Sequence, residues 1–148
     1  MSSYINAALR RLVAMRADYL CEYCLISEED AFFGCEVDHI ISEKHGGQTE
    51  ADNLAYACAF CNRSKGSDIG SIVQRIGSFV RFFNPRTDLW AEHFALDGIA
   101  IVTLSDIGEV TARILDFNNS ERLFERQTLQ TIGRYPSAAA LTRMTRRT

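Results

Sequence analysis

The chain has 148 residues, of which 47% are hydrophobic, and a formal net charge of −3. This size fits one domain, or a small core with an extension, and only two prolines argue against long disordered linkers. No apolar run reaches the roughly 18 residues of a membrane span, and the N-terminus lacks the pattern of a secretory signal. We therefore expect a cytoplasmic protein without membrane contact, whose five cysteines stay reduced.

The charge is distributed unevenly along the chain. Residues 1–61 carry four Lys and Arg against ten Asp and Glu, whereas residues 62–148 carry twelve against nine. From Arg122 onward there are six arginines and one acid, Glu125. A nucleic-acid-binding protein usually presents a basic face, so the second half of the chain is the better candidate for such a face.

The N-terminal half predicts a helix, two short strands and a second helix. The helical spacing of Ile5, Leu9 and Val13 predicts an amphipathic helix within residues 1–20. Residues 36–41 (EVDHII) and 53–57 (NLAYA) predict strands, separated by a polar loop that contains two adjacent glycines. A helix is expected from residue 62 to about residue 68.

Residues 71–135 are expected to form a C-terminal extension. The sequence FALDGIAIVTL predicts a hairpin that turns at Asp97 and Gly98. Two helices should follow over residues 106–117 and 120–133, the second capped by Asn119 or Ser120. Residues 136–148 are expected to be a flexible basic tail.

Four of the five cysteines form two CxxC pairs, Cys21 with Cys24 and Cys58 with Cys61, with 33 residues between the pairs. Each CxxC turn can present two thiolates to one ion, and two turns complete the tetrahedron that Zn²⁺ prefers. Such a closed shell indicates a structural zinc site. A redox dithiol is the alternative, but it needs a thioredoxin-like context and leaves the second pair without a role. Cys35 is most simply a small buried apolar residue.

Further motif residues lie between and beside the cysteines: Asp38, His39 and Asn53, with Asn62 directly after the last cysteine. Together the pattern CEYC…VDHII…GG…DNL…CAFCNRSKG resembles the HNH endonuclease family, in its zinc-braced bacterial form with asparagine in place of the final motif histidine. The resemblance implies an α+β protein with a ββα-metal core over residues 21–70. The segment NPRTDLWAEHF and the residues after it also resemble the extension often found behind such cores.

The resemblance implies hydrolysis of DNA, and the residue types suit that chemistry. Phosphodiester hydrolysis needs an activated water and a cation on the phosphate oxygens. His39 is the expected general base, because imidazole titrates near working pH. On a regular strand Asp38 points to the opposite face, where it and Asn62 offer oxygen ligands to one Mg²⁺ or Mn²⁺. In the family the middle asparagine braces the loop that carries the histidine, and Asn53 takes that place here.

Other interpretations stay open from the sequence alone. His39 could be a hydrogen-bonded core histidine, and Asn62 could be only a helix cap. Arg63 and Lys65 are the expected phosphate contacts, but residues 21–61 carry one lysine against nine acids, so weak and non-specific binding to the DNA backbone is expected. A protein partner could add specificity. The main rival is a non-catalytic zinc module that binds nucleic acid or protein.

Overall fold

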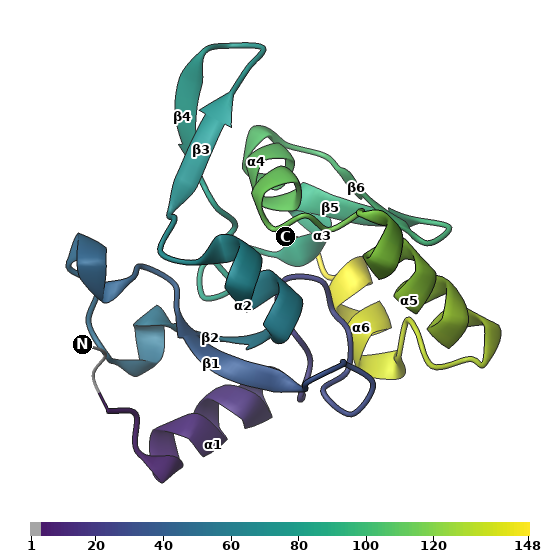
Figure 1. Ribbon diagram of the computed structural model, residues 1–148, viewed down its shortest axis with the longest axis horizontal. Helices are drawn as coiled ribbons and strands as arrows, with labels where there is room; N and C mark the ends of the chain where they lie inside the picture. Colours follow the sequence, from purple (N-terminus) through teal and green to yellow (C-terminus); the bar gives the residue numbers. More distant parts are fainter. Residues whose placement is uncertain (1–3) are drawn as a thin grey trace.

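The computed structural model describes residues 4–148 and has mixed helix and antiparallel strand content, which confirms the predicted α+β class (Figure 1). The helices are α1 (Ala7–Arg16), α2 (Ala59–Lys65), α3 (Trp90–His93), α4 (Asp106–Ile114), α5 (Ser120–Thr131) and α6 (Ala138–Thr145). The strands are β1 (Cys35–His39), β2 (Leu54–Cys58), β3 (Gly70–Val73), β4 (Ser78–Arg81), β5 (Phe94–Asp97) and β6 (Ala100–Thr103). Single 3₁₀ turns, Glu43–His45 and Ala51–Asn53, lie in the loop between β1 and β2.

The N-terminal half is a two-stranded antiparallel sheet between two helices. β1 pairs with β2 so that Val37 lies opposite Tyr56. α1 lies against one face of this pair and α2 against the other (Figure 1). Ile5 and Val13 pack with Tyr56 in a small apolar cluster under the sheet, and the side chain of Asn6 caps α1 by accepting a 2.8 Å hydrogen bond from the Leu9 amide.

The second helix starts earlier than the sequence predicts. α2 begins at Ala59 and ends at Lys65, so the second CxxC turn is its first turn. Its N-cap is Cys58, whose Sγ accepts from the Cys61 amide at 3.5 Å. This cap excludes the interpretation of Asn62 as the helix cap, because Asn62 lies inside the helix.

The extension contains two hairpins and four helices. The β5–β6 hairpin turns between Asp97 and Ala100, as predicted. The β3–β4 hairpin was not predicted, because its short strands are separated by Gly- and Ser-containing segments without clear alternation. In Figure 1 it projects away from the rest of the protein. α5 begins after Asn119, whose side chain accepts from the Arg122 amide at 3.0 Å.

The C-terminal segment differs from the expected flexible tail. α6 occupies Ala138–Thr145, and Ala140 is fully buried. Arg143 Nη2 of this helix donates a 2.9 Å hydrogen bond to the carbonyl of Arg16 at the end of α1. The tail was expected to fray because chain ends are often poorly ordered, but Ala139 and Ala140 pack on the main apolar cluster of the protein.

A single apolar core joins the N-terminal half to the extension, since both contribute to its main cluster. Trp90 Nε1 donates to the carbonyl of Tyr23 at 2.8 Å, and the Tyr135 hydroxyl donates to the carbonyl of Cys24 at 2.9 Å. Both acceptors belong to the first CxxC turn. Within residues 4–148 no helix has the length and apolar composition to cross a membrane.

Candidate active site and zinc centre

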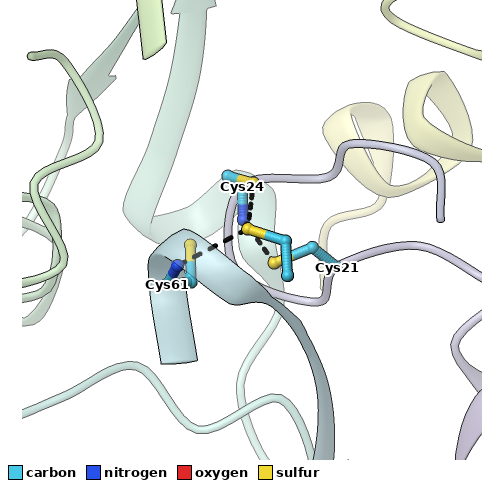
Figure 2. Close-up of side chains that lie close together, drawn as sticks. Cys21, Cys24 and Cys61 are labelled. Carbon is cyan, nitrogen blue, oxygen red and sulfur yellow. Dashed lines mark hydrogen bonds between the residues drawn. The ribbon is translucent and has the colours of Figure 1, made fainter. Parts of the chain in front are cut away.

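The two CxxC turns bring their four sulfur atoms together in the interior. The Sγ atoms of Cys21, Cys24, Cys58 and Cys61 all lie within 4.8 Å of one another, and all four residues are buried. Cys24 and Cys58, from different turns, are 3.7 Å apart, close to the edge of about 3.8 Å of a tetrahedron with zinc–sulfur bonds of about 2.3 Å. Figure 2 shows three of these side chains gathered at the first turn of α2. The donor set therefore fits zinc.

The backbone and the electrostatics of the turns also suit a cation. The Cys24 amide donates to Cys21 Sγ at 3.5 Å, as the Cys61 amide does to Cys58. Burial raises the pKa of the Cys21 and Cys61 thiols, whereas hydrogen bonds from Cys21 and its neighbours lower the pKa of Cys24. Four thiolates buried this close together repel one another, so a closed shell of four needs the charge of an ion.

The alternation of β1 divides the motif residues between two faces of the sheet. Glu36 and Asp38 face α2: Asn62 Nδ2 donates to Glu36 Oε2 at 3.0 Å, and Lys65 Nζ lies 2.9 Å from Asp38 Oδ2. His39 lies on the other face, beside a pocket of about 400 Å³ that it shares with residues of α1. Asp38 and His39 therefore point to opposite sides, as a regular strand requires.

Lys65 is placed differently from the prediction. Its side chain is 1% exposed, paired with Asp38, and Nζ also donates to the His39 carbonyl at 2.8 Å. A lysine that is buried and paired in this way is poorly placed to contact a phosphate at the surface, which argues against the predicted contact of Lys65 with substrate. Burial raises the pKa of Asp38, although the charge of Lys65 opposes that rise.

His39 is held through one of its two ring nitrogens. Nε2 lies 2.8 Å from Thr49 Oγ1 and 3.6 Å from Glu43 Oε1. Both partners lie in the loop between β1 and β2, and a carboxylate favours a proton on the nitrogen that faces it. No other described residue hydrogen-bonds the ring.

Asn53 fastens the loop between the two strands. Its Oδ1 accepts from the Ile41 amide at 2.9 Å, and its Nδ2 donates to the carbonyls of Ile41 and Gln48, each at 2.9 Å. Gly47 allows this close approach, because a Cβ there would lie 1.7 Å from the Ile41 carbonyl oxygen and 2.8 Å from Asn53 Nδ2. The loop that supplies the partners of His39 is thus held at both ends by one side chain.

Comparison with protein families agrees with this geometry. Residues 21–68 match the family model of HNH endonuclease. The match begins at Cys21 and ends shortly after α2, so it includes the four-cysteine cluster, Asp38, His39, Asn53 and Asn62. Neither the curated proteins nor the solved structures contain a significant match to the chain. Residues 21–68, called the HNH domain below, therefore match this family model, and their four-cysteine cluster is consistent with its zinc-braced form; the extension lies outside the match.

Several arginines of the more basic second half form ion pairs within the protein. Arg86 pairs with the buried Glu22 of the first CxxC turn, Arg81 forms two bonds to Asp88, and Arg75 pairs with Asp106. In the last 27 residues, Arg134 pairs with Glu29 and Asp30, and Arg143 with Asp18. Arg86, Arg134 and Arg143 therefore balance acids of the first half across the interface that the two halves share.

Arg63 remains exposed on α2 of the HNH domain, with its guanidinium 5.8 Å from the ring centroid of Phe60. Arg10 was not considered from the sequence, yet it lines the same pocket as His39. Arg122 was counted among the arginines of the basic second half, but it is 2% exposed and lies against Cys58 and Cys61. No sequence signal distinguishes Arg122 from its solvated neighbours, because burial depends on how α5 packs.

Proposed function

We propose that the HNH domain is a metal-dependent endonuclease that hydrolyses phosphodiester bonds in DNA, with His39 as general base. The family match supports nuclease function in general. The arrangement of His39 carries the finer proposal. Thr49 and Glu43 engage Nε2, so the proton belongs on that nitrogen and Nδ1 keeps the lone pair that accepts a proton from water. The 400 Å³ pocket beside the ring gives room for water and a phosphate group.

Asp38 and Asn62 are the proposed protein ligands of one Mg²⁺ or Mn²⁺. Lys65 fixes the Asp38 carboxylate through Oδ2, and a carboxylate has further lone pairs for a hard cation. Asn62 uses its Nδ2 on Glu36, which leaves its carbonyl oxygen for ligation. Bound there, a divalent ion would supply charge stabilisation on the phosphate and the leaving oxygen.

Binding to the DNA backbone would rest on few cations. Arg63 and Arg10 are the candidates near the site, because both are exposed, neither pairs with a described carboxylate, and they lie on α2 and beside the His39 pocket. Two phosphate contacts imply weak, sequence-independent and salt-sensitive binding. A protein partner would then be needed for specificity. The reduced thiols that zinc requires suit the cytoplasm.

A non-catalytic zinc module is the second candidate, and one observation favours it. Lys65 already lies 2.9 Å from Asp38 Oδ2, so the charge of the carboxylate is balanced without a divalent ion. The two candidates differ in turnover and in metal binding outside the cysteine cluster.

Nicking of supercoiled plasmid with Mg²⁺ or Mn²⁺ separates them. His39→Ala is expected to stay folded, keep its zinc and lose cleavage by about 10²-fold or more, the usual contribution of a general base. His45→Ala is the matched control, because His45 is exposed in the same loop and makes no described hydrogen bond through its side chain. Asp38→Ala should keep zinc but lose the second ion. If His39→Ala and wild type cleave equally in preparations free of contaminating nuclease, the endonuclease proposal fails and the binding module replaces it.

A further inference from the structure

Arg122 of α5 contacts the zinc centre from outside the HNH domain. Its Nη2 donates to Cys61 Sγ at 3.2 Å and to Cys58 Sγ at 3.7 Å. Its Nη1 donates to the carbonyl of Leu115 at 3.1 Å. The residue is 2% exposed, so these contacts lie in the interior.

Aromatic rings hold the guanidinium in place. Its central carbon lies 5.6 Å from the ring centroid of Phe60, which belongs to the second CxxC turn, and 5.8 Å from that of Phe117 in the extension. Among residues 4–148 no carboxylate forms an ion pair with Arg122, although a buried guanidinium needs a counter-charge. The sulfur atoms are therefore its anionic partners.

The charges of the zinc centre are complementary to this cation. Four thiolates around one Zn²⁺ sum to a formal charge of −2, in a cluster whose members are all buried. A buried net charge is costly unless it is paired. Hydrogen bonds to ligand sulfurs also lower the electron density that the thiolates offer to other electrophiles.

We propose that Arg122 is the counter-cation of the zinc centre, and that through the Cys58 and Cys61 thiolates it strengthens zinc binding and lowers thiolate reactivity. The extension is then part of the metal centre. It also donates to the backbone of the first CxxC turn through Trp90 and Tyr135. The proposal depends on the zinc centre alone and is independent of turnover at His39.

The chain offers a matched control on the same helix. Arg126 lies one turn after Arg122 and is also 2% exposed. It donates to the carbonyls of Ile99 and Phe117, at 2.6 and 2.7 Å, and to no sulfur. Substituting either arginine with methionine removes a buried guanidinium and its bonds to backbone carbonyls, but only Arg122→Met removes a cation that contacts the thiolates directly.

Zinc affinity is measured by competition with a chromogenic chelator on the folded, full-length protein. Arg122→Met is expected to bind zinc about 10- to 100-fold more weakly than wild type, the usual effect of losing a hydrogen bond to a metal ligand. Arg126→Met should stay within about threefold of wild type. In the cobalt-substituted protein, the sulfur-to-cobalt charge-transfer bands should shift in Arg122→Met and not in Arg126→Met.

A second pair tests charge and covers the case in which Arg122→Met does not fold. Arg122→Lys keeps the cation, whereas Arg122→Gln keeps polarity without charge. The lysine variant should retain zinc better and resist alkylation of the zinc-bound thiolates longer than the glutamine variant. Equal zinc affinity and equal alkylation rates in these two variants would overturn the proposal, as would equal zinc loss in Arg122→Met and Arg126→Met.

Discussion

Replacing Asn53 with alanine should weaken both the fold and the site, because one side chain holds the loop that carries the partners of His39. The substitution removes three hydrogen bonds of 2.9 Å, to the amide and carbonyl of Ile41 and to the carbonyl of Gln48. A net contribution of about 0.5–1 kcal/mol for each bond, the lower half of the usual range because Asn53 is only half-buried, gives a loss of about 1.5–3 kcal/mol in the free energy of unfolding. Urea denaturation followed by circular dichroism measures this loss.

Cleavage should fall as well, since Thr49 positions His39 from the same loop. Displacement of a catalytic group by about 1 Å costs up to 10²-fold, so we expect plasmid nicking to drop by about 10- to 100-fold in Asn53→Ala. The His39 ring signals in an NMR spectrum should also broaden or move.

Asn118 provides the control, because its side chain hydrogen-bonds both the amide and the carbonyl of Ile101 in the extension, as the side chain of Asn53 does with Ile41. Its Nδ2 donates to the Ile101 carbonyl at 2.8 Å, and its Oδ1 accepts from the Ile101 amide at 2.9 Å and from Arg126 at 2.8 Å. Asn118→Ala should therefore lose similar stability, but it should keep its cleavage activity at temperatures at which the variant is still folded. The reasoning is refuted if Asn53→Ala is as stable as wild type, or if both variants lose cleavage equally.

Further predictions concern the zinc, the glycine pair and pH. Chelation of zinc or Cys58→Ser should lower the melting temperature by more than about 10 °C, because binding free energy in a closed site is folding free energy; an unchanged melting curve with no bound zinc contradicts this. Gly47→Ala should destabilise more than Gly46→Ala in thermal melts, since a Cβ at Gly47 meets backbone at 1.7 Å whereas Gly46, at φ 87°, has open space and costs only about 1–2 kcal/mol of strain. Burial alone raises the pKa of Asp88, but hydrogen bonds from Arg81 and a backbone amide lower it more, to below its ordinary 3.8. The unfolded state then binds the proton more tightly, so this stabilisation is present above about pH 4 and is lost as the pH falls through the folded pKa. Asp88→Asn should cost about 1 kcal/mol at pH 7, and urea denaturation should show that cost shrinking below about pH 4.

The order and spacing of a few residues were enough to predict the HNH domain and the zinc ligands. A CxxC turn is a local structure, and thiolates in this pattern have few other roles, so the cysteine cluster followed from the sequence. The opposite directions of Asp38 and His39 followed from the alternation of any regular strand. The β5–β6 hairpin and the cap of α5 were also local signals, carried by a turn dipeptide and one asparagine.

The roles of the basic residues were decided only by the tertiary structure. Lys65 and Arg122 look the same in the sequence as the exposed Arg63, because a cationic side chain is suited to solvent, to a phosphate or to a buried anion. The partner of each side chain depends on which face of its helix packs inward and on which charged groups are buried at that interface. For Lys65 that charge is Asp38, 27 residues earlier, and for Arg122 it is the thiolates of Cys58 and Cys61, more than 60 residues earlier. These ion pairs are set by packing between segments that are distant in the sequence, and the local sequence pattern around each residue does not specify that packing.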